Sequence, residues 1–293
     1  MVRTNLITKL NNKTTASLLA ILSNCILISV KFLIAGISGS VSILSEAIHS
    51  GMDLLASLIV FFSIRLSAEP ANESFPFGYG KIENISALLE GILLFAAALI
   101  IIAEAIPKII YPVETAETYL AIGVMSISTV INFLISSHLY KVAKSEDSMA
   151  LAADAAHLRT DTYSSLGVAV GIILMRITGL HIIDPIIAVI VAMLITKAAY
   201  NLSRNALVQL LDARIPPEQC LKIKEVLERC QDKIINYHEI KTRKAGNNTF
   251  INLHITVDKN LTVKESHALE DFIESELELV IKNAYINIHV DPS

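Results

Sequence analysis

The stretch Ser45–Asp53 reads SEAIHSGMD, and about a hundred residues later Ala153–Asp161 reads ADAAHLRTD. Each stretch has an acid, then an alanine, then a histidine followed by an aspartate four residues later, and each lies within an otherwise apolar run. Residues four apart share one face of a helix, about 6 Å apart along its axis. Each stretch therefore predicts an imidazole and a carboxylate side by side on an apolar helix.

The composition is that of a membrane protein. Of the 293 residues, 53% are hydrophobic and only 18% are charged, whereas soluble domains have roughly 25% charged residues. The mean hydropathy is +0.56. A net charge of −4 gives no support for nucleic-acid binding. The three cysteines form no CxxC pair, so neither a disulfide scaffold nor a cysteine zinc site is indicated.

Six apolar windows approach the roughly 20 residues that a membrane-spanning helix needs. They are Ala16–Ile37, Ile43–Arg65, Ile85–Ile106, Tyr119–Ser137, Met149–Met175 and Ile182–Leu202. Lysines and arginines gather before the first window and after the second, fourth and sixth. By the positive-inside rule this places both termini in the cytoplasm, which agrees with an even number of spans.

The chain becomes polar after Asn205. Pro216-Pro217 opens a polar helix, and an acidic amphipathic helix follows Thr262, with Glu265 completing a capping box. Strands are expected at residues 237–244, 249–258 and 284–291. The predicted fold is an all-α six-helix transmembrane domain (1–208) followed by a small cytoplasmic α+β domain (209–293) of α-β-β-α-β order.

The two quoted stretches predict a metal site in the membrane. Together His49, Asp53, His157 and Asp161 offer two nitrogens and two carboxylates, a set that suits tetrahedral Zn²⁺. An aspartate at a helix centre costs about 2.5–3.5 kcal/mol on insertion scales, and a bound divalent cation would offset that cost. The two helices run antiparallel, as in the inverted repeats from which transporters build midplane sites.

Other readings of these polar residues remain open. A lone histidine in the membrane is often a hydrogen-bonding contact between helices. Glu46 and Asp154 are either partners of the site or protonated residues of the bundle, and are not assigned to the site. Four further charged residues are expected to pair with other groups or to extend towards the membrane surface. These are Lys31, Glu90, Glu104 and Lys197.

The sequence resembles the cation diffusion facilitator family over essentially its whole length. The resemblance is carried by HSGMD, FGYGKIE (Phe77–Glu83), ADAAHLRTD, HIIDPIIA (His181–Ala188) and NIHVDP near the end. It implies a homodimer of six-helix protomers that export divalent metal by proton antiport, with a metallochaperone-like cytoplasmic domain. The two-histidine, two-aspartate set resembles the zinc-transporting branch, and Fe²⁺, Co²⁺, Mn²⁺ and Cd²⁺ are the alternative cargoes.

The resemblance also implies a zinc cluster at a cytoplasmic dimer interface. It assigns His238, His254, His289 and Asp291 to that cluster, together with His267 on the second helix. The pattern HxD at the last strand places both side chains on one face of the sheet. The alternative is that these are ordinary surface histidines.

Of two other features of the family, this sequence lacks one and matches the other. Some members bind a second metal in the loop after the second span, but the matching positions here are Asn72, Phe75 and Tyr79, so that site is not expected. Lys81 matches a lysine that pairs with an aspartate at the domain junction in relatives, and Asp212 is the matching acid. The alternative for Lys81 is an ordinary positive anchor at the membrane surface.

The sequence therefore predicts a Zn²⁺/H⁺ antiporter in the inner or plasma membrane of a cell, not an enzyme. Its partners would be metal ions, protons, membrane lipid and a second copy of the chain. An intramembrane zinc enzyme would need a general base, usually in an HExxH motif, which neither stretch contains. A membrane-anchored metal sensor or scaffold would have no need of a costly buried site.

Overall fold

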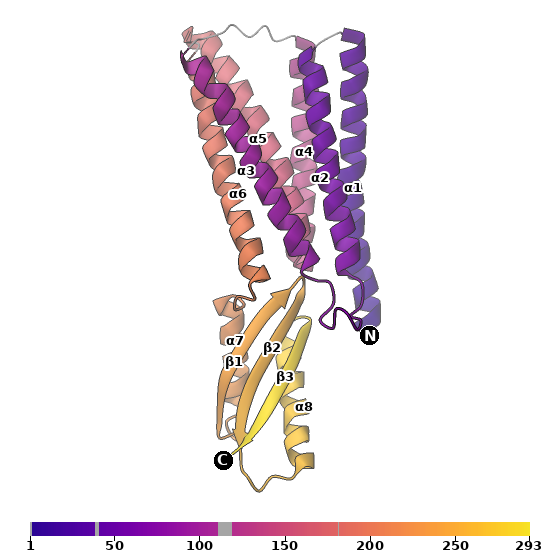
Figure 1. Ribbon diagram of the computed structural model, residues 1–293, viewed down its shortest axis with the longest axis vertical. Coiled ribbons are helices and arrows are strands. Elements are labelled where there is room, and N and C mark those ends of the chain that lie inside the picture. Colours follow the sequence, from indigo (N-terminus) through magenta and orange to yellow (C-terminus); the bar gives the residue numbers. More distant parts are fainter. Residues whose placement is uncertain (1, 39–40, 111–118, 181) are drawn as a thin grey trace. The chain divides into compact units, whose positions relative to one another are not determined.

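The computed structural model describes residues 2–38, 41–110, 119–180 and 182–293 (Figure 1). The chain divides into two compact units, Met1–Ala206 and Leu207–Ser293. Long helices make up the first unit. They are α1 (Val2–Ser38), α2 (Val41–Ser67), α3 (Ile82–Ile110), α4 (Tyr119–Glu146), α5 (Met149–Thr178) and α6 (Ile183–Leu210).

The expected apolar windows coincide with these helices, which confirms the all-helical first domain. Among the described residues, five helices contain a stretch long and apolar enough to cross a membrane. α5 is not among them, and its described part contains three charged residues, Asp154, Arg159 and Asp161. Its 30 residues nevertheless give it a length of about 45 Å. α5 is therefore long enough to cross a membrane.

Close packing between helices fixes the centre of the bundle. α1 packs along α2, α4 packs along α5, and α3 contacts both α2 and α5. A side chain at Gly91 of α3 would collide with Ser203 of α6, so glycine permits this close approach. Gly167 of α5 lies in the same way against Val191 of α6, where an added Cβ would be 2.6 Å from a methyl group. α6 is thus held against both α3 and α5.

Glu83, at the start of α3, joins four segments of the bundle. Its carboxylate accepts hydrogen bonds from Lys13 of α1 at 2.9 Å, from Ser67 of α2 at 3.1 Å, and from Ser148 just before α5. Lys13, Glu83 and Ser148 are buried. A buried ion pair is tolerated when further hydrogen bonds satisfy its remaining lone pairs. Both oxygens of Glu83 meet that condition.

The second unit has the expected α-β-β-α-β order. Its elements are α7 (Pro217–Arg229), β1 (Asn236–Ala245), β2 (Asn248–Val257), α8 (Val263–Val280) and β3 (Ala284–Pro292). The sheet order is β1-β2-β3, in which β1 and β2 are antiparallel and β2 and β3 are parallel. The parallel pair requires a crossover connection, which α8 supplies. The capping box between Thr262 and Glu265 is confirmed.

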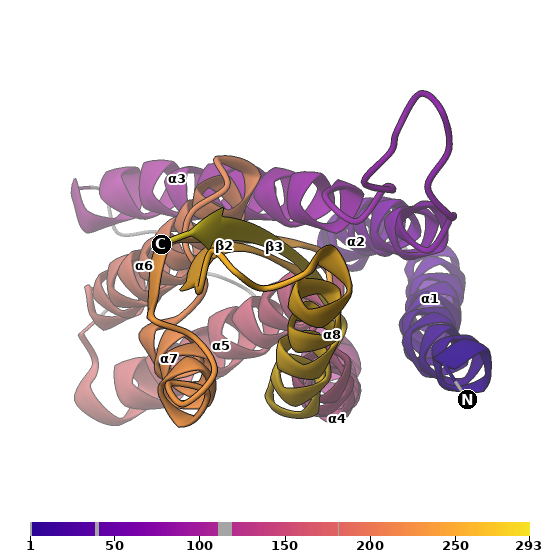
Figure 2. The ribbon, with the colours of Figure 1, turned by 90° about the horizontal axis from the view of Figure 1, so that it is seen from below.

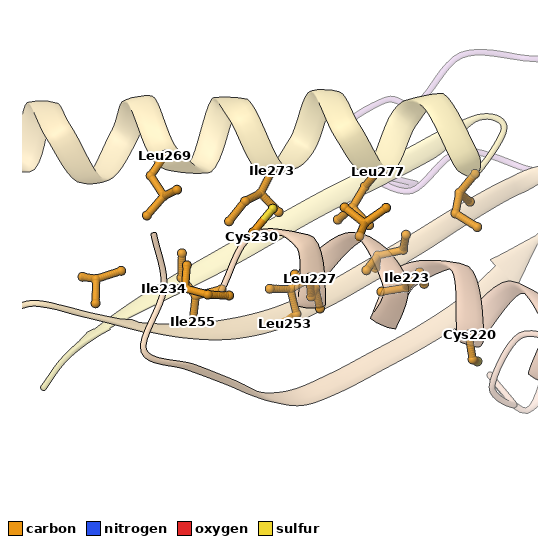
Figure 3. Packing of buried hydrophobic residues seen from close by; sticks show 14 of the residues in the cluster. Cys220, Ile223, Leu227, Cys230, Ile234, Leu253, Ile255, Leu269, Ile273 and Leu277 are labelled. Atoms are coloured by element: carbon orange, nitrogen blue, oxygen red, sulfur yellow. The ribbon is translucent and has the colours of Figure 1, made fainter. Parts of the chain in front are cut away.

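Both helices of this unit cover the same face of the sheet (Figure 2). Figure 3 shows the core between them, where Ile273 of α8 and Leu227 of α7 point towards Leu253 of β2. Along β2, buried residues such as Leu253 alternate with more exposed ones such as Asn252 and His254. The face that carries His254 is therefore turned away from the helices.

Candidate metal centre

Three of the four predicted membrane ligands converge in the first unit. Asp53 comes from α2, while His157 and Asp161 lie one turn apart on α5. His157 Nε2 is 3.2 Å from Asp53 Oδ1 and 3.9 Å from Asp161 Oδ2. One donor atom from each residue lies within 4.8 Å of the other two, a separation that suits shared coordination of one ion. Asp53 is buried, and His157 and Asp161 are largely so.

His49, the fourth predicted ligand, lies beside this group without being part of it. Its Nε2 atom is 3.9 Å from Asp53 Oδ1, as expected for residues one turn apart on α2. Its side chain is 56% exposed, in contrast to the other three. The membership of His49 in the site stays a prediction.

A second polar network flanks the group. Asp154 of α5 is fully buried and accepts a hydrogen bond of 3.0 Å from Ser57 of α2, which in turn accepts one from Asn24 of α1. Lys31 of α1 is also buried and donates to Ser50 of α2 at 2.7 Å. These contacts join α1, α2 and α5 around the donors. The side chain of Glu46, the other unassigned acid, lies outside the described residues.

Glu90 is the residue that the sequence interpretation underestimated. It was expected to pair with another group or to extend to the membrane surface; it is 1% exposed, so it does not extend to the surface, and its contact is with a residue of the predicted site. Its Oε2 atom lies 3.1 Å from His157 Nδ1, the ring nitrogen that faces away from Asp53. A sequence signal was available: Glu83, Ala87, Glu90 and Leu94 follow helical spacing, and all are buried. That spacing places Glu90 on the inward face of α3.

Contacts among Asn72, Phe75 and Tyr79 hold the loop after α2 together. These residues occupy the positions at which some family members bind a second metal. Asn72 donates to the Tyr79 hydroxyl at 2.8 Å and accepts from the backbone N–H groups of Ser74 and Phe75. The rings of Phe75 and Tyr79 pack at a centroid distance of 4.6 Å. An amide, a phenol and a phenyl ring are not among the usual ligands of Zn²⁺. The expectation of no metal site here stays a prediction.

In the second unit, strand pairing aligns three histidines in one row. His238 of β1 is opposite His254 of β2, and His254 is opposite His289 of β3. The ring centroids are 5.2 Å apart for the first pair and 4.6 Å for the second. The register between β1 and β2 shifts immediately after His238, at Glu239, where φ is 48°. Such irregularities re-aim neighbouring side chains.

Asp291 lies across this row and contacts all three rings. Its Oδ2 atom is 3.1 Å from His254 Nδ1 and 3.4 Å from His238 Nε2, while Oδ1 is 3.4 Å from His289 Nε2. His238, His254 and Asp291 together form a group that fits a metal ion. We call His238, His254, His289 and Asp291 the histidine row. Nearby, a hydrogen bond from Lys241 lowers the pKa of Glu239 and keeps its carboxylate charged.

Two predicted residues lie apart from these groups. His267 is on α8, which packs on the other face of the sheet, and its nitrogens are 3.6 Å from Glu270 and 4.0 Å from Asp271. Its part in a zinc cluster stays a prediction. Asp212 is 3.4 Å from Arg243 within the second unit. The predicted ion pair between Lys81 and Asp212 joins residues of the two units and likewise stays a prediction.

Comparisons with known proteins cover nearly the whole chain. A family model described as the cation efflux transmembrane domain matches residues 17–211, and one described as the cation efflux protein cytoplasmic domain matches residues 215–293. An uncharacterized transporter of Synechocystis is 33% identical over 256 residues, which cover 87% of this chain and 83% of that protein. The cation-efflux pump FieF of Shewanella oneidensis is 26% identical over 266 residues, covering 91% and 89%.

One solved structure that matches is described as the zinc form of the putative zinc transporter CzrB. It is 33% identical and covers 27% of this chain and 91% of that chain, with a TM-score of 0.26.

Proposed function

Because the chain belongs to the cation efflux family, whose members are transporters of divalent cations, we propose that its cargo is zinc, exported in exchange for protons. The chain is a multi-pass membrane protein. In our proposal both termini are cytoplasmic, the membrane is the cell's inner or plasma membrane, and the working form is a homodimer. No step of this function requires enzymatic chemistry.

The observation that carries the proposal is the convergence of Asp53, His157 and Asp161 within the membrane unit. A mixed set of imidazole and carboxylate donors suits Zn²⁺. His49 would complete a tetrahedral set, since it is one helical turn from Asp53 and within 3.9 Å of its carboxylate. Zinc would enter from the cytoplasmic side, and rearrangement of the helices would open the site outwards.

Proton coupling follows from the same donors. A metal binds ionised aspartate and neutral histidine, so protons compete with zinc for each ligand. The ordinary pKa of histidine is about 6.5, close enough to neutrality for a modest pH difference to favour release. Protons arriving from the outer side would therefore displace the cargo and travel inwards on the same residues.

The exposure of His49 favours one alternative cargo class. Without His49 the site would have two carboxylates and one imidazole, and oxygen-rich sites accept Mn²⁺ more readily, whereas Fe²⁺ shares the preference of Zn²⁺ for imidazole. Cd²⁺ and Co²⁺ are the other alternative cargoes to be compared with Zn²⁺. The identity of the transported ion can therefore be tested separately from the efflux function.

The histidine row would form a second zinc site, in the cytoplasmic domain at the homodimer interface. Three imidazoles and Asp291 lie on one sheet face that the helices of the same unit leave uncovered. A second copy of the chain could bring His267 to such a site. The pair between Lys81 and Asp212 would join the two domains.

The test is metal uptake by proteoliposomes that contain the purified chain, with an imposed pH gradient. Zn²⁺, Co²⁺, Mn²⁺, Fe²⁺ and Cd²⁺ are compared one at a time, while an internal dye reports proton movement. Asp53→Ala and Asp161→Ala should each abolish zinc uptake. Glu104→Ala removes an exposed carboxylate from α3 and serves as the matched control, with flux unchanged. Normal flux in either aspartate variant contradicts the site, and zinc flux without proton movement contradicts antiport.

A further inference from the structure

A third carboxylate, Glu90 of α3, lies against the metal-facing group without being one of the predicted ligands. The imidazole of His157 has two nitrogens that point in different directions. Nε2 faces Asp53 and Asp161, whereas Nδ1 is 3.1 Å from Glu90 Oε2. The ring is therefore held between the proposed metal ligands on one side and Glu90 on the other.

The packing of α3 fixes the position of Glu90. Ala87 and Leu94, one turn on either side of it, are buried in a cluster with Ala153 of α5. The next residue, Gly91, allows close approach of α6 at Ser203. α3 is thus held against α5 and α6 at the level of this carboxylate. The Glu90 carboxylate therefore reaches His157 without any movement of α3.

Burial makes the partnership with His157 necessary. A carboxylate at 1% exposure inside a membrane bundle loses its hydration, which is costly unless another group compensates for it. Within the described part of the chain, neither Glu90 Oε2 nor His157 Nδ1 forms a hydrogen bond of good geometry with any group, and the 3.1 Å contact joins these two atoms to each other. Each of these two atoms is therefore the nearest group that can replace the hydration that the other has lost.

We propose that Glu90 is a positioning residue for the membrane metal site. It accepts the Nδ1–H of His157, and so selects the tautomer in which the Nε2 lone pair is free to bind the metal. Carboxylate–histidine–metal arrangements of this kind fix both the tautomer and the ring orientation, and loss of the outer partner typically weakens metal binding by about 10–100-fold. The inference rests on the proposed membrane site and adds a residue from a third helix to it.

The first test measures zinc affinity in the full-length protein by competition with a fluorescent chelator. His254→Ala and Asp291→Ala are included in every variant, to remove binding at the histidine row. In this background Glu90→Ala should weaken binding by about 10–100-fold, and Glu90→Gln should restore most of it because its amide oxygen still accepts the Nδ1–H. Glu104→Ala on the same helix is the matched control and should bind normally.

The Asp161→Ala variant distinguishes a failure of the proposed role of Glu90 from a failure of the proposed membrane metal site. If Asp161→Ala binds zinc as tightly as the parent, the membrane site is wrong and the role of Glu90 is wrong with it. If Asp161→Ala loses binding while Glu90→Ala does not, only the inference fails. A Glu90→Gln variant as weak as Glu90→Ala also overturns it, because charge or packing would then be what matters.

A second measurement needs no substitution at Glu90. In protein labelled with ¹⁵N-histidine, the zinc-bound state should show His157 with a protonated Nδ1 and a metal-shifted Nε2, assigned by comparison with His157→Gln. A signal in which Nδ1 carries the metal shift would overturn the proposal, even if Glu90→Ala fails to fold.

Discussion

Replacement of two residues of the histidine row should abolish the response of the cytoplasmic domain to zinc. The fragment Leu207–Ser293 has a core of its own between α7, α8 and the sheet, so it can be studied alone. His254 and His289 lie on the opposite face from that core. The double variant His254→Ala with His289→Ala should therefore keep the apo fold and lose the ligands.

The size of the zinc effect follows from linkage. A ligand that binds only the folded state at a hundredfold excess over Kd stabilises it by about 2.7 kcal/mol. For the unit 207–293, an unfolding entropy of about 2.1 cal/mol/K per residue amounts to about 0.18 kcal/mol/K, so Tm should rise by about 15 °C. The shift should fade as the pH falls, because only neutral imidazole binds metal.

Thermal melts followed by circular dichroism, with zinc and then with excess chelator, provide the assay. The matched control is Asn252→Ala with Asn287→Ala, which changes the neighbouring aligned pair on the same two strands and should leave the zinc shift intact. An equal zinc shift in the wild type and in the histidine double variant would identify these residues as ordinary surface histidines.

Three further outcomes are expected. His49→Asp should lower the ratio of Zn²⁺ to Mn²⁺ flux in proteoliposomes, since it moves the donor set towards oxygen; an unchanged ratio would exclude His49 as a selectivity ligand. Glu83→Leu should destabilise the detergent-solubilised protein by about 3–5 kcal/mol in melts, because it leaves Lys13 buried without its carboxylate. The double variant with Lys13→Met should recover much of that loss, and a loss equal to that of the single variant would refute the reasoning. Ile273→Ala should cost the cytoplasmic fragment about 2–5 kcal/mol in denaturant unfolding, because Ile273 is fully buried between α8 and the sheet.

Local signals in the sequence predicted most of the secondary structure. Hydropathy located the helices of the bundle, but it marks only their apolar segments: α1 begins at Val2, well before the window at Ala16, because polar residues outside the membrane layer can continue a helix. In the second unit, proline at the start of α7 and the Thr262–Glu265 box are chemical signals within one turn of chain, and both were read correctly.

The contacts that the sequence left undecided are those between distant segments. The alignment of His238 and His289 on either side of His254 depends on strand register, which one strand does not reveal. The pairing of Glu90 with His157 joins residues that are far apart in the chain, and it depends on how α3 packs on α5. Helical spacing offers a signal that Glu90 faces inwards, which the sequence interpretation did not use, but no local pattern indicates its partner.

The buried acids of the bundle differ in which groups pair with their carboxylates. This difference distinguishes an acid that stabilises the bundle from the acids of the proposed metal site. Glu83 has a lysine and two serines on its two oxygens, so the protein itself provides its partners. At the centre, Asp53, Asp161 and Glu90 all face the one imidazole of His157. Three carboxylates around one ring would repel one another in a medium of low dielectric unless cations or protons join them. Zinc in one half of the cycle and protons in the other would satisfy the same atoms, so the arrangement that makes this part of the bundle costly is also what would couple the two fluxes.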